Sequence, residues 1–549
     1  MNDSGPSLFR IPYKLRTLGI PFARLMVSTA LAIFALSGRA NASECTRTIP
    51  SLTKFYSDAW GIDLRSTRFQ PAQMTSVTAA NVSRLRLKWV FGLSSDAPRS
   101  YPLVTEDTIF IGDGGNVVAL DRQTGCTRWT FKHSGSIGSA ILHEVKNGVA
   151  TLFFSDRTNG LFAVNAGDGI LRWKRPAPGD NPIPLLSGTP LIHDGTMFVP
   201  LSSFEIGLAV NPFYGCCTTS GGMAAINTSD GDELWYRRTI PTLPRVTGRH
   251  LLFVEDQAPS GAPAWAAPTL DTARGTLFFG TGQNYSRPTT NTSDSIFALN
   301  TADGSIRWRR QFTAGDAYNT SCDLTERHPN CPKPMGPDLD LGAPPILAHT
   351  LDGRELLIAG EKSGAVYALN PDDGSVVWTY RAGRGGALGG VHWGMAVNET
   401  LGLLFVPVSD IVAGHLTGEG EARPGLFALD LATGALRWSH LRMARCPDRT
   451  CSPGLSAAII AGPDLVFAGS LDGKLEAVDA RRGKLLWTYD SWRDYPTTVN
   501  GTPAKGGSFD AHGPMLAGDQ LIVSSGYGSF FQRAGNALLV FELTRDEKP

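Results

Sequence analysis

Two carboxylates separated by one residue, Asp338 and Asp340, occur in the segment GPDLDLG, residues 336–342. On an extended chain, residues two apart point to the same side, so both carboxylates can approach one cation. Asn284, in the glycine-flanked segment GTGQNYS, offers a side-chain carbonyl oxygen, a donor that hard cations such as Ca²⁺ prefer. These residues predict a metal site; the alternative is a solvated acidic loop.

A pair of adjacent cysteines, Cys216 and Cys217, stands in the segment NPFYGCCTTSGG, residues 211–222. Neighbouring Cα atoms are ~3.8 Å apart across a trans peptide, below the ~4.4–6.8 Å usual for a disulfide. A bond between them closes a strained eight-membered ring, and strain of this kind persists mainly at functional sites. The pair therefore indicates a site rather than a structural staple.

A repeat ending in tryptophan must position these residues. Seven segments match one template: VVALDRQTGCTRW, LFAVNAGDGILRW, MAAINTSDGDELW, IFALNTADGSIRW, VYALNPDDGSVVW, LFALDLATGALRW and LEAVDARRGKLLW. Each has an alternating apolar strand, an Asp or Asn, a Gly four residues later and a Trp four residues beyond. The centre is typical of a turn between two strands, in which Gly adopts positive φ. The tryptophans are expected to lock each unit onto its neighbour.

The repeat spacing, 44 to 73 residues between tryptophans, is the period of a β-propeller blade of about four strands. An eighth unit is divided between the two ends of the chain. Residues 536–543 have the strand without the turn, and residues 85–93 supply Trp89. We therefore predict an all-β, eight-bladed propeller, closed by N- and C-terminal strands that share one blade and hide the sheet edges.

The N-terminus has the order of a secretory signal. Basic residues precede the apolar run LMVSTALAIFAL, residues 25–36, and Ala40-Asn41-Ala42 follows as a cleavage site. Twelve apolar residues are too few to span a bilayer comfortably, although an uncleaved anchor is the alternative. We predict a signal peptide at 1–42, a lead-in segment at 43–84, the propeller at 85–549, and a periplasmic or secreted protein without a stable membrane span.

Eight cysteines in an exported chain predict disulfides. Cys322 with Cys331, and Cys446 with Cys451, each close a short loop, so local pairing is expected. Elimination then leaves Cys45 to pair with Cys126. The 50 basic and 50 acidic side chains give no electrostatic case for nucleic acid. No C-x-x-C-H segment occurs, so this sequence carries no covalent c-type haem.

The repeat resembles the tryptophan-docking motif of the quinoprotein alcohol dehydrogenases, which carry pyrroloquinoline quinone (PQQ). The resemblance covers most of the chain after the signal and is greatest for the polyvinyl-alcohol-dehydrogenase branch. That branch has runs similar to YGCCT, APSGAPAWAAPTLD, GTGQNYS, GPDLDLGAPPIL, GEKSGAVYALNP and HWGMAV. The resemblance implies PQQ with Ca²⁺, or a lanthanide in its place, and oxidation of an alcohol to the ketone or aldehyde.

The resemblance also implies roles for residues that match the family motifs. The cysteine ring and Trp265 would lie on opposite faces of PQQ, and Lys362 would stand beside the quinone oxygens. Asp338 would be the catalytic base. The implied metal ligands are Glu205, Asn284, Asp338 and Asp340, and the further cofactor contacts are Arg99 and Trp393.

Some positions depart from the family pattern. Gln283 is inserted before Asn284, which leaves open which amide points inward. Thr219 and Ser220 stand where the branch commonly has an aromatic residue and an Arg. His392 is a tempting second base, although a lone His more often bonds locally.

The implied substrate is a secondary alcohol, with polymers such as polyvinyl alcohol included, and the electrons must leave to an external acceptor, expected to be a cytochrome c. Two other functions compete with this reading. A non-enzymatic scaffold of the outer-membrane assembly type shares the repeat but has no need of the cysteine pair, Trp265 or Lys362. A hydrolase or lyase that uses the carboxylates alone leaves the cysteine pair unexplained.

Overall fold

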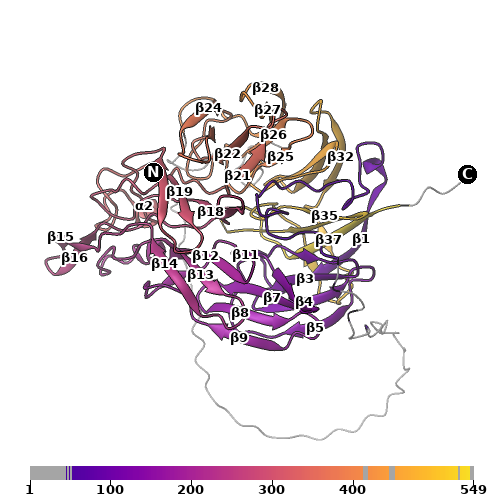
Figure 1. Cartoon of the computed structure of the whole chain (residues 1–549), viewed down its shortest axis with the longest axis horizontal. Helices are drawn as coiled ribbons and strands as arrows, with labels where there is room; N and C mark the ends of the chain where they lie inside the picture. Colours follow the sequence, from indigo (N-terminus) through magenta and orange to yellow (C-terminus); the bar gives the residue numbers. More distant parts are fainter. Residues whose placement is uncertain are drawn as a thin grey trace, which may run out of the picture. The chain divides into compact units, whose positions relative to one another are not determined.

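The seven repeated segments form the last two strands of seven antiparallel sheets, and the predicted turns join these strands. The computed structural model describes residues 45, 49, 52, 54–411, 418–443, 452–529 and 532–544, all within the unit Ala42–Pro549. The signal segment predicted at 1–42 therefore lies outside the described residues. Figure 1 shows the sheets of this unit following one another around a ring.

The first four blades lie between Leu103 and Gln311. Their strands are β2 (Leu103–Val104), β3 (Thr108–Asp113), β4 (Asn116–Asp121) and β5 (Thr127–Phe131) in blade 1; β6 (Leu142–Lys146), β7 (Val149–Asp156), β8 (Gly160–Asn165) and β9 (Leu171–Arg175) in blade 2; β10 (Pro184–Leu185), β11 (Leu191–His193), β12 (Thr196–Ser203), β13 (Gly222–Asn227) and β14 (Glu233–Arg238) in blade 3; and β17 (Thr269–Asp271), β18 (Thr276–Gly280), β19 (Ser295–Asn300) and β20 (Ile306–Gln311) in blade 4.

The other four blades complete the ring. Their strands are β21 (Ile346–His349), β22 (Glu355–Gly360), β23 (Ala365–Leu369) and β24 (Val376–Arg381) in blade 5; β25 (Ala396–Asn398), β26 (Leu403–Val408), β27 (Gly425–Asp430) and β28 (Leu436–Leu441) in blade 6; β29 (Ile460–Ala461), β30 (Leu465–Gly469), β31 (Lys474–Asp479) and β32 (Leu485–Asp490) in blade 7; and β35 (Met515–Ala517), β36 (Gln520–Ser525), β37 (Ala537–Leu543) and β1 (Leu85–Gly92) in blade 8.

Short elements stand outside the blades. They are the 3₁₀ helix η1 (Val82–Arg84), α1 (Glu205–Leu208), α2 (Ser321–Leu324), the hairpin of β15 (Arg245–His250) with β16 (Val254–Ala258), and the pair of β33 (Asp494–Tyr495) with β34 (Ala504–Lys505). Within the described ranges, none of the helices has the length and apolar character that a membrane crossing requires.

Six of the seven template tryptophans dock on the next blade in the same way. In each, the indole N–H donates to the backbone carbonyl that directly follows the Asp or Asn of the next repeat. The donor–acceptor distances are 3.1 Å for Trp129 to Ala166, 2.9 Å for Trp173 to Thr228, 2.9 Å for Trp235 to Thr301, 2.9 Å for Trp308 to Pro371, 3.1 Å for Trp378 to Leu431 and 3.0 Å for Trp438 to Ala480. The predicted docking role of these residues is confirmed.

The template glycine is required by the same docking contact. Gly374 has φ +70°, and a Cβ added there would lie 2.6 Å from the Trp308 ring. A side chain at this position would therefore meet both an unfavourable backbone conformation and the indole of the preceding blade. One residue thus forms the turn and leaves the face on which the tryptophan lies.

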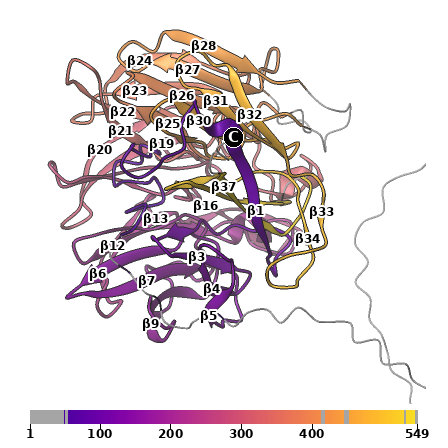
Figure 2. The same ribbon diagram turned by 90° about the vertical axis from the view of Figure 1, so that its right-hand side faces the viewer.

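The predicted ring closure is confirmed. Strands β1 and β37 pair antiparallel, from Leu85 opposite Leu543 to Gly92 opposite Ala537, and Figure 2 shows them side by side. Blade 8 lacks the template turn, so Trp487 instead packs edge to face on Phe541 of β37, with ring centroids 5.5 Å apart.

The segment before β1 runs across the ring. Its backbone carbonyls accept N–H groups from the first strands of four successive blades: Leu64 from Leu270, Arg65 from Leu347, Thr67 from Val397 and Arg68 from Ala461. One short segment that reaches four blades in turn must lie over their common centre. It therefore covers one end of the ring and fixes the inner strands that carry the site.

Candidate active site

Lys362, in the turn between β22 and β23 of blade 5, meets the two predicted carboxylates. The Lys362 ammonium Nζ lies 2.8 Å from Oδ2 of Asp340 and 3.3 Å from Oδ2 of Asp338. The three residues are 5, 4 and 8 % exposed, respectively. Burying an ion costs free energy unless an opposite charge is close by. The ammonium and the two carboxylates therefore stabilise one another in this buried position.

The loop carrying the carboxylates differs from the expected extended strand. Asp338 has φ +58°, and residues 336–342 form no strand. The carboxylate of Asp316 accepts the backbone N–H groups of Asp338 at 3.2 Å and of Leu339 at 2.8 Å. The two side chains therefore converge because Asp316 fixes a turn, not because of strand alternation.

Asp340 also orients Trp265. Its Oδ2 accepts the indole N–H at 3.1 Å, and its Oδ1 accepts the backbone N–H of Gln283 at 3.0 Å. Lys362 Nζ lies 5.7 Å from the centre of the partly buried indole ring, within cation–π range. A Cβ at Gly342 would lie 2.1 Å from this ring, so the glycine is needed for the indole's position.

The charges of this group do not balance. Burial raises the pKa of Asp338 to about 8; Lys362 opposes the rise, and Asp340 and Asp316 add to it. Burial also raises the pKa of Asp316 to about 6. Burial opposes the charged form of Lys362 as well, but the two carboxylates raise its pKa overall. The single positive charge of Lys362 therefore cannot neutralise the carboxylates of Asp316, Asp338 and Asp340 if all three are ionised.

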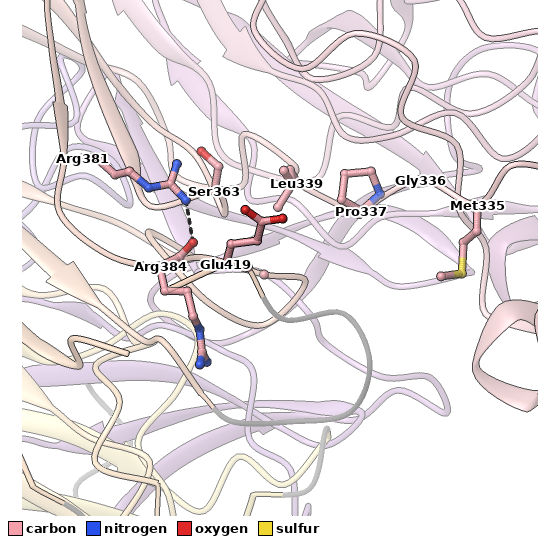
Figure 3. A pocket seen from close by; sticks show the side chains of 10 residues that line it. Met335, Gly336, Pro337, Leu339, Ser363, Arg381, Arg384 and Glu419 are labelled. Atoms are coloured by element: carbon pink, nitrogen blue, oxygen red, sulfur yellow. Dashed lines mark hydrogen bonds between the residues drawn. The ribbon is translucent and has the colours of Figure 1, made fainter. Parts of the chain in front are cut away.

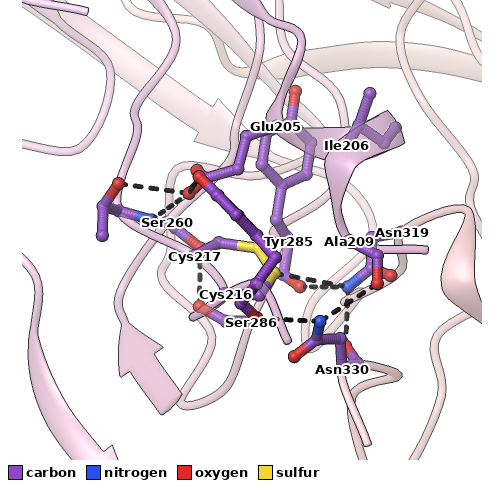
Figure 4. Close-up of a disulfide and its surroundings, with 12 residues drawn as sticks. Glu205, Ile206, Ala209, Cys216, Cys217, Ser260, Tyr285, Ser286, Asn319 and Asn330 are labelled. Carbon is purple, nitrogen blue, oxygen red and sulfur yellow. Dashed lines mark hydrogen bonds between the residues drawn. A yellow bond between two sulfur atoms is a disulfide. The ribbon is translucent and has the colours of Figure 1, made fainter. Parts of the chain in front are cut away.

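The cysteine pair lies in a loop that contacts Glu205 of α1 (Figure 4). Cys216 and Cys217 are bonded to each other and buried. Oε1 of Glu205 accepts the Thr218 backbone N–H at 2.6 Å, and Oε2 accepts that of Thr219 at 2.7 Å. The hydroxyls of Tyr214 and Thr219 donate to the same carboxylate. Glu205 is therefore the anchor of the loop that carries the disulfide.

The remaining disulfide predictions concern three pairs. Cys45 is bonded to Cys126, and Cys322 to Cys331, as expected. Cys446 and Cys451 lie outside the described residues.

Asn284 is engaged within its own loop. Its Nδ2 donates to the Ser260 carbonyl at 2.9 Å, and its Oδ1 accepts the Thr290 backbone N–H at 2.8 Å. The side chain of Gln283 donates to the carbonyl of Tyr318 at 3.4 Å. The structure thus brings Asn284 into the buried shell of the site with its amide already bonded.

An aromatic group extends from Trp265 into the centre of the ring. The Trp265 and Trp393 ring centroids are 5.3 Å apart, and those of Trp393 and Tyr527 are 6.3 Å apart. Arg99 lies over Tyr527, with its guanidinium carbon 5.1 Å from the ring centre. Burial lowers the pKa of His392 well below its ordinary value, and its Nδ1 bonds the Ser456 hydroxyl at 2.8 Å. His392 is therefore a neutral, locally bonded residue.

A cavity of about 490 Å³ adjoins the catalytic candidates (Figure 3). Pro337 and Leu339, on either side of Asp338, form part of its lining, together with Ser363, which follows Lys362. Arg384 and Glu419 also line it. A small molecule in this cavity would lie beside the backbone that carries Asp338 and Lys362.

Several residues of the site carry no recognisable sequence signal. Asp316, Asp294 and Glu361 surround the carboxylate loop, and both carboxylate oxygens of Asp294 are buried without a hydrogen-bond partner. Isolated acids in loops are ordinarily solvated, so only the structure identifies them. Thr218 and Thr219 could have been found, since two hydroxyls beside the cysteine pair are natural partners for a carboxylate.

Comparisons with known proteins identify the family. The PQQ_2 family model, described as "Outer membrane protein assembly factor BamB", matches residues 73–293 and 294–547. Polyvinylalcohol dehydrogenase from Pseudomonas sp is 35% identical over 506 residues, covering 88% of this chain and 76% of that protein. The enzyme of the same name from Sphingopyxis sp. (strain 113P3) is 33% identical over 488 residues, covering 87% and 73%. This chain belongs to the quinoprotein alcohol dehydrogenase family.

As a quinoprotein alcohol dehydrogenase, the protein is an oxidoreductase, and its family implies PQQ as the cofactor. The solved quinohemoprotein alcohol dehydrogenase from Comamonas testosteroni has the same fold, with a TM-score of 0.66 at 17% identity over 91% of this chain and 82% of that one. The matching family model carries the description of an assembly factor, which is the scaffold alternative. However, the two relatives that are 33–35% identical to this chain are named as dehydrogenases, which favours the enzyme.

The residues present fit a PQQ-type cofactor. A partly buried indole face lies beside a permanent cation, and the surplus carboxylates can accommodate a hard cation through oxygen donors. Within the described part of the chain, no three His, Cys, Asp or Glu side chains converge into a metal site. A cation at this place would therefore need ligands from the cofactor as well as from the protein.

Proposed function

We propose that this protein oxidises an alcohol, in the first place a secondary one, to the ketone or aldehyde with PQQ and Ca²⁺. Polymeric substrates such as polyvinyl alcohol are included, because two polyvinylalcohol dehydrogenases are 33–35% identical to this chain. The observation that carries the proposal is the contact of Asp340 with both Lys362 and Trp265. It links a flat stacking surface to a buried cation, as a quinone needs.

Asp338 is the proposed base. Its ionised carboxylate would take the hydroxyl proton of an alcohol that enters from the adjoining cavity, which is lined by its neighbours Pro337 and Leu339. When bound, PQQ supplies the redox chemistry by accepting a hydride from the carbinol carbon. The proton therefore goes to the protein and the electron pair to the cofactor, and the alcohol becomes a carbonyl compound.

Lys362 and Trp265 act as positioning and charge-stabilising groups. Lys362 keeps one ammonium close to the place where negative charge develops, in a site from which water is largely excluded. Trp265 is fixed by its hydrogen bond to Asp340, so its ring has one orientation. Cys216 and Cys217 are the proposed opposite face, and Arg99 and Trp393 the further cofactor contacts.

Glu205, Asn284, Asp338 and Asp340 are the proposed metal ligands. They offer carboxylate and amide oxygens, which suit Ca²⁺ or, as the alternative, a lanthanide. The surplus negative charge around Asp338 supports a divalent or trivalent cation at this position. Such an ion would supply Lewis acidity and keep Asp338 ionised at neutral pH.

The proposed location and the proposed electron acceptor rest on features of the sequence. The signal-type N-terminus and the disulfides Cys45–Cys126 and Cys322–Cys331 support the periplasm or secretion. Because the chain has no C-x-x-C-H segment, an external acceptor, a cytochrome c, is proposed to take the electrons.

The test is reconstitution of the purified protein with PQQ and Ca²⁺, and in parallel with La³⁺. Reduction of an artificial dye is then followed with secondary alcohols, primary alcohols and polyvinyl alcohol. We expect dye reduction that requires PQQ, an added cation and an alcohol, with secondary alcohols oxidised faster. Failure to bind PQQ with either cation would overturn the proposal; binding with faster oxidation of primary alcohols would overturn only the substrate class.

A further inference from the structure

Two arginines beside the aromatic group, Arg99 and Arg157, form no direct ion pair with the carboxylates that the structure describes. Arg99 and Arg157 are both partly buried, and neither side chain is within ion-pair distance of a carboxylate in the described part of the chain. The Nε–H group of Arg157 is buried without a hydrogen-bond acceptor. An arginine has five N–H donors and normally finds acceptors for them when it leaves water.

Arg68, in the same region, is an arginine whose N–H donors have acceptors. It is fully buried, and its donors reach three backbone carbonyls: Ile459 at 2.5 Å, Trp60 at 3.1 Å and Pro514 at 3.1 Å. The fold can thus supply acceptors to a central guanidinium. The buried Nε–H of Arg157 has no such acceptor.

The nearest carboxylates are already engaged. Asp156 accepts backbone N–H groups from Thr158 at 2.9 Å and Asn159 at 2.8 Å, and its second oxygen contacts His133 at 3.1 Å. Asp510 accepts the backbone N–H of Ala511 and the side-chain amide of Gln532, at 2.8 and 2.9 Å. Burial and the charge of Arg99 lower the pKa of Arg157. Asp156 and Tyr527 offset this lowering in part, but neither of the two carboxylates forms an ion pair with Arg99 or Arg157.

The pair is connected to the proposed cofactor floor. Arg99 lies over Tyr527, Tyr527 contacts Trp393, and Trp393 contacts Trp265, at centroid distances of 5.1, 6.3 and 5.3 Å. Lys362 stands directly beside Trp265, whereas the arginines are reached only through two further rings. The site thus has one cation at the floor and two unpaired cations beyond it.

We propose that Arg157, together with Arg99, binds a carboxylate of PQQ. PQQ is a planar quinone that carries three carboxylates, so its quinone end and its carboxylate end need different partners. A guanidinium fork matches a carboxylate in two parallel hydrogen bonds. Gly138 makes room for the stem of Arg157, because a Cβ there would lie 2.6 Å from its Cγ. The inference rests on the proposed PQQ function.

The experiment is a titration of the cofactor-free protein with PQQ in the presence of Ca²⁺, followed by tryptophan fluorescence. We expect R157Q to weaken PQQ binding at least about tenfold, as the loss of a charged hydrogen bond does, and R157K to bind with intermediate strength. R172Q, at an exposed position on β9 of the same blade, is the matched control and should bind as the wild type does. Thermal melting checks that each variant is folded.

The trimethyl ester of PQQ distinguishes the contribution of the carboxylate charges to binding from that of the ring system. It should bind the wild type and R157Q equally, since it carries no carboxylate. Equal binding of PQQ itself to R157Q and the wild type overturns this inference and leaves the proposed function standing. Absence of PQQ binding by the wild type overturns both. If R157Q does not fold, two other comparisons decide. The inference is contradicted if R157K binds PQQ as tightly as the wild type does and the wild type binds PQQ and its ester equally tightly.

Discussion

Lys362 Nζ lies 2.8 Å from Oδ2 of Asp340, and the same carboxylate oxygen accepts the indole N–H of Trp265 at 3.1 Å. One carboxylate therefore sets the positions of both the cation and the aromatic floor. Its other oxygen is held by the backbone of Gln283, so the group has little freedom to move. Asp340 therefore fixes the relative positions of Lys362 and Trp265 in the proposed quinone site.

Replacing Lys362 should damage both folding and turnover. K362M removes the cation that, among the described residues, pairs with Asp338 and Asp340, and it leaves buried carboxylates unpaired, so we expect about 3–5 kcal/mol lower stability. K362R keeps the charge and should retain most of the stability. Urea unfolding of both variants measures the difference. Equal unfolding midpoints for K362M and the wild type would show that the pairing is not structurally important.

Replacing Asp338 should separate binding from chemistry. D338N keeps the side chain's size but cannot accept a proton, so we expect retained PQQ binding and dye reduction slower by about 10²–10⁴-fold. R172Q, at an exposed position on β9, provides the reference activity. Turnover in D338N at the wild-type rate would remove Asp338 from its role.

The stability of the cation-free protein should fall as pH rises. The folded-state pKa values of Asp316 and Asp338, about 6 and about 8, lie above the ordinary 3.8, so the folded protein binds more protons than the unfolded chain at intermediate pH. Stability is therefore lost as the pH rises through these values. Because cations need ionised ligands, Ca²⁺ should raise the melting temperature more at about pH 8 than at about pH 6. An equal Ca²⁺ effect at both pH values would contradict this account.

The docking glycine can be tested against a matched position. G374A places a methyl group against Trp308 at a residue with φ +70°, and we expect about 1–3 kcal/mol lower stability from crowding in addition to the backbone cost. Gly148 has φ +75° with nothing within 4 Å of an added Cβ, so G148A carries the backbone cost alone. Equal destabilisation by the two substitutions would show that the tryptophan contact does not constrain the turn.

Much of the fold could be predicted because its signal is repeated. The spacing of Asp or Asn, Gly and Trp recurs seven times, and six of the copies make the same contact with the next blade. The contacts of the lead-in segment with the blades were not predictable in this way. Its binding across four blades depends on backbone carbonyls, such as those of Leu64 and Thr67, which leave no trace in side-chain pattern.

The site was only partly predictable. Asp338, Asp340 and Lys362 do come together, but strand alternation was the wrong reason, since Asp316 holds Asp338 in a turn. Asn284 could not be oriented from sequence, because Thr290 and Ser260 compete for its amide. Arg157 gave no signal at all. Its lack of partners is a property of the folded environment, and a sequence shows only that an arginine is present.

The most direct test of the central claim is a titration of cofactor-free wild-type protein with PQQ and Ca²⁺, followed by addition of a secondary alcohol. The account predicts saturable binding of one PQQ per chain, and a change in the absorption spectrum of the bound cofactor when alcohol is added. W265A and the C216S/C217S double variant should both weaken this binding. Absence of saturable binding, or a bound cofactor whose spectrum does not respond to any alcohol, would contradict the account.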